Sequence, residues 1–356
     1  MPSPKKAVVV GALGVIGRYI VEKLLAEGDW QVIGLSRRAA PGTPRYRHIA
    51  VDLLDNHDVV GKLTHLGDIT HIFYAAFQPG TGGNAAGYAS VIAPNRDMLV
   101  NAVTAIDRQS KSLNRVVLVT GTKYYGVHLG PVKTPMRETD PRHMPPDFYF
   151  DQVDWLTGFQ HDKSWNWTEL RPQTLCGFAP GTAMSILPAI AVYAAVSREL
   201  GLPLRFPGKP GAYGSIYQVT DSAHFATAAL WAATEPRCAN EAFNITNGDY
   251  FRWRNVWPRI AQVFDMEVGE VQTISLSQNM ADKDGLWSAM TKKYGLKEFD
   301  YGQLVAWPFA DYVFGSEWDV MSDVTKSRLN GFHDVVDSEA MFERLLTRFR
   351  QEKIVP

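Results

Sequence analysis

The stretch that decides the fold lies near the amino terminus and reads Ala7-Val-Val-Val10-Gly11-Ala-Leu-Gly14-Val-Ile-Gly17. Residues 7–10 form a continuous β-branched run that ends at a glycine, which is typical of a strand buried in a parallel sheet. Residues 18–27 follow as a predicted helix, and Gly28 is a residue that commonly ends one. The stretch therefore predicts a strand, a glycine turn and a helix in direct succession.

The same alternation continues along the chain. Further strands are predicted at residues 31–35, 48–51, 71–75, 115–120 and 167–171, and a helix at 98–107. Strands that alternate with helices favour an α/β fold with a doubly wound parallel sheet.

The pattern becomes irregular after about Gly177. A helix is predicted at 185–200, a Pro/Gly-rich loop at 204–214, a helix at 219–234, a strand at 241–245 and tryptophan-rich helices from Trp253 onward. We expect a dinucleotide-binding domain formed by residues 1–182 and about 215–248. A smaller, mainly helical substrate-binding domain would comprise 183–214 and about 249–356.

Composition excludes several classes of protein. The chain has 356 residues, 46% hydrophobic and 21% charged, with a formal charge of −1, so it can bury a large core and carries no general attraction for nucleic acid or anionic membranes. Only Cys176 and Cys238 are present, which fits a reducing compartment and predicts a cytoplasmic protein. The apolar stretch 183–196 is too short to span a bilayer. No His, Cys or carboxylate residues have metal-ligand spacing, so no metal is expected.

The glycine turn predicts a dinucleotide site. Gly11 permits the tight turn, Gly14 lets the backbone approach a pyrophosphate, and Gly17 lets the helix pack closely on the strand. The helix amino terminus then offers N–H groups to the phosphates.

The residues after the second predicted strand indicate which dinucleotide is bound. An acidic residue that binds the ribose diol of NAD is typical at this point, but this chain has Ser36, Arg37 and Arg38. An arginine pair can bind a 2′-phosphate, whereas a carboxylate would repel it. The sequence therefore predicts NADP(H), with Asp52 and Leu53 beside the adenine.

The candidate catalytic residues follow the fifth predicted strand. Lys123 lies in Thr120-Gly-Thr-Lys-Tyr-Tyr-Gly126, at the carboxyl end of a strand, where α/β sheets bind ligands. Tyr149 opens a predicted helix but has Val153, not a lysine, four residues later. The Tyr-x-x-x-Lys pair of ordinary short-chain dehydrogenases is therefore missing here. Either the protein is catalytically dead, or Lys123 supplies the positive charge from a different element.

At these positions the chain resembles the plant progesterone 5β-reductase and iridoid synthase family, which are atypical extended short-chain dehydrogenase/reductases. The similarity covers nearly the whole chain. It is carried by Thr-Gly-x-Lys-x-Tyr at 120–125, Phe-Tyr-x-Asp at 148–151, Arg-Pro at 171–172, Gly-Phe-Ala-Pro at 177–180, Val-Tyr-Ala-Ala at 192–195, Asn-Glu-Ala-Phe-Asn at 240–244, Asn-Gly-Asp at 247–249 and Lys-Ile-Val-Pro at 353–356.

The resemblance implies NADPH-dependent reduction of the activated C=C bond of an enone or enal by 1,4-hydride addition. It places the family's catalytic lysine and tyrosine on Lys123 and Tyr149. A phenol that is acidified or assisted by the ammonium would stabilise the enolate oxygen. Two alternatives stay open: a ketone or aldehyde reductase that uses the same Tyr149, and a catalytically silent NADP-binding sensor. The expected partner is a small hydrophobic carbonyl substrate, and a homodimer is left open.

The departures from the family surround the expected substrate. Tyr124 stands where a histidine is usual, and Phe150 replaces a second tyrosine, so these departures bear on the identity of the substrate and not on the class of reaction. Phe77, Met184 and Tyr213 are expected to form pocket walls, with aromatic residues from the carboxyl-terminal segment. Leu13, Val15, Ala75 and Leu175 are expected to contact the cofactor.

Overall fold

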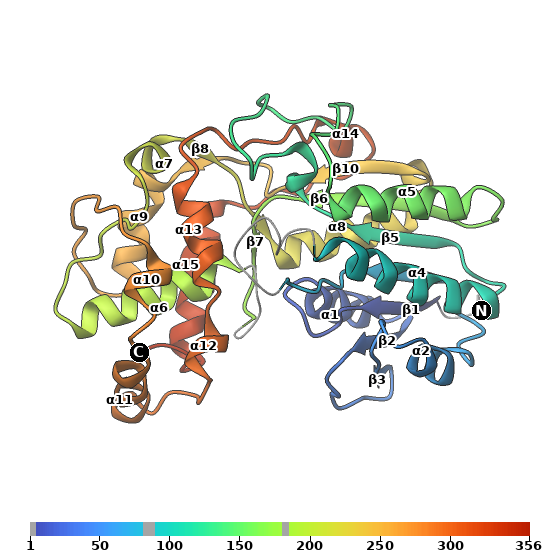
Figure 1. The fold of residues 1–356 in the computed structure, drawn as a ribbon, viewed down its shortest axis with the longest axis horizontal. Coiled ribbons are helices and arrows are strands. Elements are labelled where there is room, and N and C mark those ends of the chain that lie inside the picture. Colours follow the sequence, from blue (N-terminus) through green and yellow to red (C-terminus); the bar gives the residue numbers. More distant parts are fainter. Residues whose placement is uncertain (1–4, 81–89, 180–184) are drawn as a thin grey trace.

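The protein is described here by a computed structural model, which covers residues 5–80, 90–179 and 185–356. Figure 1 shows a lobe built around a sheet and a second, mainly helical lobe beside it. The sheet has seven strands in the order β10-β6-β5-β4-β1-β2-β3, and all its pairs are parallel. Their bounds are β1 Lys5–Val10, β2 Trp30–Ser36, β3 Tyr46–Ala50, β4 His71–Tyr74, β5 Arg115–Val119, β6 Asn166–Pro172 and β10 Glu241–Ile245.

Alternating side chains of each strand fill cores on opposite faces of this sheet. On β1, Val8 and Val10 belong to a core with α2, α4 and α5, whereas Ala7 and Val9 belong to a core with α1 and α8. A strand buried on both faces needs apolar residues without interruption, which explains the continuous run at residues 7–10. The covering helices are α1 Gly17–Glu27, α2 Asn56–Leu63, α4 Ile92–Gln109, α5 Phe148–Gln160 and α8 Ser222–Thr234.

The doubly wound α/β class predicted from the sequence is confirmed. Two local differences from the prediction are found. The first is that α8 begins only at Ser222, because residues 220–221 pair as a short strand. Asp221 then caps the helix by accepting from the amides of Ala223 and His224. Helix α2 was absent from the prediction and begins after Asp55, whose side chain accepts from the amides of His57 and Asp58.

The second lobe has an aromatic core. Trp253 and Trp257 are fully buried and pack with Phe206, Phe314 and Phe342. The helices of this lobe are α6 Ile186–Glu199, α7 Pro210–Gly214, α9 Trp253–Val263, α10 Leu276–Asn279, α11 Asp284–Tyr294, α12 Tyr301–Leu304, α13 Trp307–Gly315 and α15 Ser338–Gln351. Helix α14 Thr325–Leu329 lies beside β10 of the sheet lobe (Figure 1). Short strands pair as β7 Leu175–Cys176 with β9 Thr220–Asp221, and β8 Ile216–Tyr217 with β11 Phe251–Arg252. Single turns of 3₁₀-helix are η1 Thr122–Tyr125 and η2 Pro236–Cys238.

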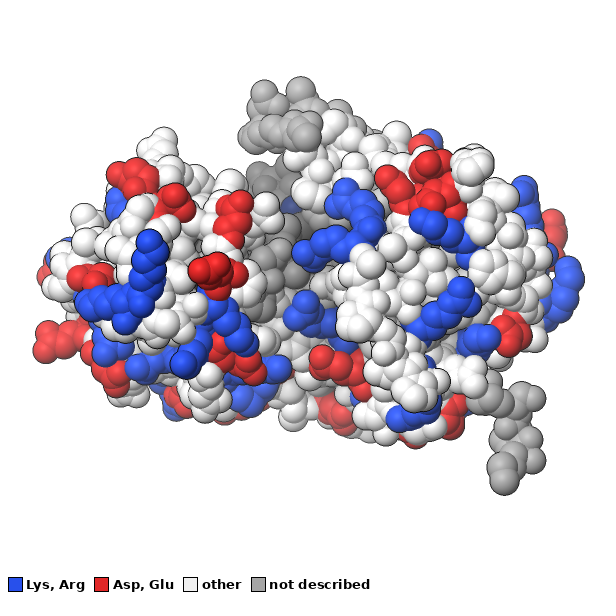
Figure 2. All heavy atoms as spheres, turned by 90° about the horizontal axis from the view of Figure 1, so that it is seen from below, with Lys and Arg blue, Asp and Glu red and all other residues white. Residues whose placement is uncertain are grey.

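The surface carries charges of both signs. Figure 2 shows one face of the molecule, on which basic and acidic side chains are interspersed over both lobes. Within the described ranges, no helix combines the length and the apolar character needed to cross a membrane.

Candidate active site

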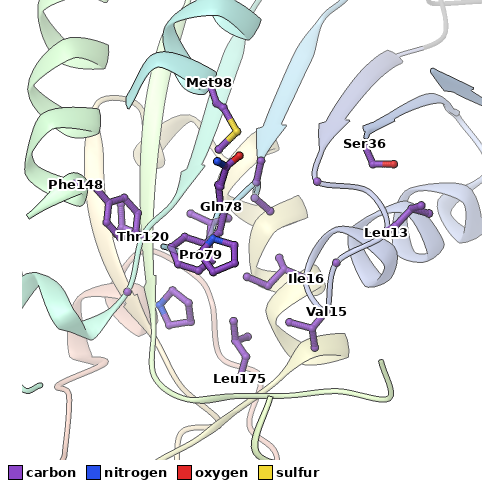
Figure 3. A pocket seen from close by; sticks show the side chains of 18 of the residues that line it. Leu13, Val15, Ile16, Ser36, Gln78, Pro79, Met98, Thr120, Phe148 and Leu175 are labelled. Atoms are coloured by element: carbon purple, nitrogen blue, oxygen red, sulfur yellow. The ribbon is translucent and has the colours of Figure 1, made fainter. Parts of the chain in front are cut away.

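A cavity of about 770 Å³ lies at the carboxyl edge of the sheet. Its walls come from the segments that follow β1 through β6, from the start of α5, and from α12 and α13 of the helical lobe. Figure 3 shows Leu13, Val15 and Ser36 toward one end of this cavity and Met98 and Phe148 toward the other. The sequence-predicted site residues among its lining are Gly11, Leu13, Gly14, Val15, Ser36, Arg37, Arg38, Asp52, Leu53, Ala75, Phe77, Lys123, Tyr149 and Leu175.

The glycine turn forms one end of the cavity. Gly11 has a φ of +83°, and a Cβ atom on it would lie 2.8 Å from the Ala75 carbonyl oxygen, so only glycine suits this turn. Gly17 lies outside the lining and has a packing role, since a Cβ there would overlap the Gly11 carbonyl. Helix α1 begins after Ile16, which provides no side-chain cap. Uncapped amides beside a tight glycine turn fit the pyrophosphate of a dinucleotide.

The turn after β2 presents two arginines at the cavity. Arg37 and Arg38 line it, and neither guanidinium forms an ion pair within the described part of the chain. The Ser36 hydroxyl donates to the Arg38 carbonyl over 2.7 Å and lies 2.9 Å from Nε2 of His48, so this serine shapes the turn. Asp52 is partly engaged as well, because its Oδ1 accepts from the Leu54 amide over 3.0 Å.

Lys123 is held at the cavity by the tyrosines that follow it. The Tyr125 hydroxyl donates to Asn244 Oδ1 over 2.7 Å, and the Tyr124 ring lies under the Arg171 guanidinium, 3.5 Å from the ring centroid. With both tyrosines buried, η1 leaves Lys123 at the cavity wall. Its Nζ is 5.8 Å from the ring centroid of Tyr312, which comes from α13.

Tyr149 is in the first turn of α5 and lines the same cavity. Asp147 caps this helix by accepting the Tyr149 amide over 2.8 Å. Phe148 packs on the phenol with ring centroids 4.3 Å apart, and Phe150 is buried against Tyr124 at 5.1 Å. Phe148 and Tyr149 thus line the cavity together, whereas Phe150 is buried against Tyr124.

The pKa values of Tyr149 and Lys123 shift in opposite directions. Burial raises the pKa of the Tyr149 phenol well above its usual range, and the carboxylates of Asp147 and Glu169 raise it further. Burial lowers the pKa of Lys123, and Asp147 opposes that shift. Of the two roles expected for the ammonium, which were to acidify or to assist the phenol, the raised pKa of Tyr149 favours the second, because the phenol stays protonated and can act as a neutral hydrogen-bond donor.

Aromatic side chains from three segments wall the space beside these groups. Phe77 stacks on Phe148 with ring centroids 5.5 Å apart. Phe309 and Tyr312 line the cavity from α13, which Asp311 anchors by accepting from the Leu276 amide over 2.6 Å.

One expected pocket wall is wrong and one cannot be placed. Tyr213 is not part of the lining, because its ring in α7 packs against Phe206, with centroids 4.9 Å apart, at the edge of the core of the helical lobe. Met184 lies outside the described residues.

The comparisons with known proteins agree with this geometry. Residues 50–356 match the PRISE-like Rossmann-fold domain family. The chain belongs to the PRISE-like family. An (S)-8-oxocitronellyl enol synthase of Nepeta cataria is 33% identical over 367 residues, covering 98% of this chain and 93% of the relative. A 3-oxo-Δ4,5-steroid 5β-reductase of Arabidopsis thaliana is 32% identical over 371 residues, with the same two coverages of 98% and 93%. The resemblance predicted from the motifs is thus confirmed.

The fold of this PRISE-like chain is also found in solved structures. The Thermus thermophilus UDP-glucose 4-epimerase in complex with NAD matches with a TM-score of 0.67 at 18% identity, over 97% of this chain and 99% of the epimerase. At that identity the match establishes only that the two chains share the Rossmann fold.

Several lining residues of the PRISE-like site were not predicted. They include Gln78, Pro79, Met98, Thr122, Phe148, Gln173, Gln303, Phe309 and Tyr312. The sequence indicated aromatic residues from the carboxyl-terminal segment but could not select Phe309 and Tyr312. Phe148 could have been predicted, because it directly precedes Tyr149 in the sequence.

The fold also brings together three possible metal ligands that the sequence did not indicate as a group. Potential ligand atoms of His128, His143 and Asp147 all lie within 4.8 Å of one another. Nδ1 of His143 is 2.7 Å from the Met144 carbonyl oxygen and its Nε2 is 3.2 Å from Asp147 Oδ2. The positive charge of Lys123 is felt at this cluster. Burial lowers the pKa of His128 to about 4, and the Lys123 ammonium contributes to this shift as the second cause. A neighbouring positive charge opposes binding of a metal cation.

Proposed function

We propose that this protein is an NADPH-dependent reductase of the activated C=C bond of enones and enals. The observation that carries the proposal is that Lys123 and Tyr149 line one cavity together with the glycine turn. One relative is a 3-oxo-Δ4,5-steroid 5β-reductase, and a 3-oxo-Δ4,5-steroid has a carbonyl conjugated with a C=C bond. That chemistry fits a phenol donor in a cavity with aromatic walls.

NADP(H) is the proposed cofactor. The uncapped start of α1 would hold the pyrophosphate, and Arg37 and Arg38 would bind the 2′-phosphate. Leu13, Val15, Ala75 and Leu175 would contact the cofactor through backbone groups or van der Waals packing, with Asp52 and Leu53 near the adenine. When bound, NADPH supplies a hydride to the β-carbon of the substrate.

The residues of the chain then act on the charge that develops on the carbonyl oxygen. Tyr149, protonated because of its raised pKa, donates a hydrogen bond to the enolate oxygen. The Lys123 ammonium, which lines the same cavity, adds a positive charge. Phe148, which is buried and lines the cavity beside Tyr149, limits access of water to the phenol and strengthens its hydrogen bond. Since Tyr149 acts as a donor and keeps its proton at the end, the α-carbon takes a proton from solvent.

The test is to incubate the protein with NADPH and a panel of enones, enals and ketones, and to identify the products. Loss of the C=C bond with the carbonyl retained supports the proposal. An alcohol product would replace it with carbonyl reduction at the same Tyr149. Tight NADPH binding without turnover of any compound would favour a catalytically silent sensor.

Three further expectations accompany the proposal. The two-domain division at about residues 182, 215 and 248 stays a prediction; the two cores on the faces of the sheet support it, whereas the core of the helical lobe also includes Tyr124, Phe150 and Tyr217. A homodimer and a cytoplasmic location stay predictions. Size-exclusion chromatography with light scattering and limited proteolysis address the dimer and the domain boundaries.

A further inference from the structure

The Lys123 ammonium lies over the aromatic ring of Tyr312. Its Nζ is 5.8 Å from the ring centroid, within the distance at which a cation is attracted to the face of an aromatic ring. Lys123 belongs to η1 of the sheet lobe, whereas Tyr312 belongs to α13 of the helical lobe. The contact therefore joins the proposed catalytic cation to the opposite lobe.

Helix α13 presents this ring to the cavity. Phe309 and Tyr312 are three residues apart, so they lie on one face of the helix, and both line the cavity. The residues of α13 that are buried in the core of the helical lobe are Ala310, Val313 and Phe314. Asp311 fixes the helix by accepting the Leu276 amide over 2.6 Å. The position of the Tyr312 ring is thus set by the packing of its own lobe.

The contact joins a cation to a neutral ring. Burial raises the pKa of the Tyr312 phenol to about 12, so the hydroxyl keeps its proton near neutral pH. Burial lowers the pKa of Lys123 and Asp147 opposes that shift, but this carboxylate pairs with Nε2 of His143 over 3.2 Å. His128 is uncharged near neutral pH, because burial lowers its pKa to about 4. Lys123 itself forms no ion pair with any residue that the structure describes.

An aromatic partner suits the proposed reaction better than a carboxylate partner. A carboxylate in direct contact would neutralise the charge that the enolate oxygen needs, whereas a ring face attracts the ammonium and leaves its net charge intact. An ammonium has three N–H donors, and a ring covers only one side of it. The remaining donors of Lys123 can act on the substrate.

We propose that Tyr312 is a positioning residue of the reductase site, whose ring face holds the Lys123 ammonium at the cavity without neutralising it. This inference rests on the proposed function. It assigns the role to the electrons of the ring and not to the phenolic hydroxyl.

That assignment defines a graded series of variants at one position. Tyr312→Phe removes the hydroxyl and keeps the ring. Replacing Tyr312 by mono-, di- and trifluorinated phenylalanine changes the size of the side chain little, but each fluorine withdraws electrons from the ring face and weakens its attraction for a cation. Trifluorination of Phe309 is the matched control, because among the described rings that of Tyr312 is the one over Nζ of Lys123.

The primary readout needs neither cofactor nor substrate. Acetic anhydride acylates only the unprotonated amine, so the pH dependence of Lys123 acetylation, followed by peptide mass spectrometry, reports how strongly the site stabilises the ammonium. We expect wild type, Tyr312→Phe and the fluorinated Phe309 variant to share one midpoint. The midpoint should fall with each fluorine at position 312, by about half a pH unit or more for the trifluorinated ring.

Two results would overturn the proposal. A midpoint that does not respond to fluorination at position 312 would show that only the volume of the side chain matters. A fall in Tyr312→Phe as large as that with the trifluorinated ring would assign the effect to the hydroxyl. Circular dichroism and melting temperature confirm that each variant is folded.

The secondary readout is steady-state kinetics with an enone. If the ring holds the charge that stabilises the enolate, kcat should fall stepwise with fluorination at position 312, by about threefold or more in total, while KM changes little. A purely structural role of the Tyr312 ring would give no such gradient. Failure of the wild-type enzyme to turn over any enone would refute the proposed function, and the acetylation midpoints would still decide whether the ring holds the Lys123 ammonium.

Discussion

Gly121 and the Tyr149 hydroxyl pack so closely that a Cβ atom on Gly121 would lie 3.2 Å from the phenolic oxygen. Gly121 follows β5 in extended backbone, with a φ of 166°, so its conformation does not require glycine. The missing side chain instead makes room for the phenol. The strand end that carries Lys123 thus also sets the position of Tyr149.

Gly121→Ala should impair catalysis without unfolding the protein. A methyl group there forces the phenol to move by a few tenths of an ångström, and misplacement of a catalytic group is costly, so we expect kcat to fall by roughly tenfold or more. Steady-state kinetics and urea unfolding measure the two effects separately. The matched control is Gly158→Ala, at an exposed position of α5 with open space around it, which should raise stability by about 0.5–1 kcal/mol and leave kcat unchanged. Equal kcat for Gly121→Ala and wild type would argue against a Tyr149 hydroxyl placed by Gly121.

Removing the hydroxyl itself should have a larger effect. We expect Tyr149→Phe to lower kcat by about 100- to 1,000-fold, because the enolate oxygen loses a preorganised donor. The Kd for NADPH, measured by fluorescence titration, should change little. Tyr250→Phe, at a largely exposed tyrosine, serves as the control. Turnover near the wild-type value would transfer the donor role to another group, with Tyr312 as the nearest candidate on α13.

The sheet and the cofactor end of the site were predictable because local patterns encode them. Residues 7–10 lie within β1, and Arg37 and Arg38 line the cavity directly after β2. A parallel strand is recognised by an uninterrupted apolar run, and strand ends converge at one edge of the sheet. Topology alone therefore placed Lys123 at the cavity.

The substrate end was less predictable because it depends on tertiary packing. Phe309 and Tyr312 line the cavity, and the other described aromatic residues of the carboxyl-terminal segment do not, because Asp311 anchors α13 to Leu276. These last two residues are 35 positions apart in the sequence. Tyr213 was wrong for the same reason, since its ring is taken up by the core around Phe206. The contact of His143 with Asp147 likewise arises from a loop conformation that no periodicity describes.

The arginine pair after β2 should select between NADPH and NADH. We expect the double variant Arg37→Ala/Arg38→Ala to bind NADPH about 10- to 100-fold more weakly, because charge-assisted hydrogen bonds to the 2′-phosphate are lost. NADH lacks that phosphate, so its Kd should change far less. Titration of both cofactors against the double variant, with Lys111→Ala as an exposed control, gives the comparison. An equal loss for the two cofactors would refute the assignment of the 2′-phosphate site.

A buried ion pair near the site should contribute strongly to the free energy of unfolding of the protein. Glu169 and Arg171 are almost completely buried, and their charged atoms lie 2.7 Å apart. Arg171→Ala leaves an unpaired buried carboxylate and should cost about 3–5 kcal/mol of unfolding free energy. Removing both charges in Glu169→Leu/Arg171→Leu should cost much less than the sum of the two single leucine substitutions. Additivity of the two changes in urea unfolding would show that the pair contributes no coupling energy.

Acid stability should depend on His71, whose pKa burial lowers to about 4. The ring packs edge-on against Trp30 at 4.9 Å, and its Nδ1 lies 2.8 Å from Thr70 Oγ1. Unfolding restores a pKa near 6.5, so the unfolded chain binds more protons than the native state between those two values. Stability is therefore lost as the pH falls from about 6.5 to 4, by up to roughly 3 kcal/mol from this residue. The non-titrating His71→Asn should show a shallower loss in urea unfolding across that range. The exposed His161→Asn should keep the wild-type slope, and an identical slope for His71→Asn would assign the acid sensitivity to other groups.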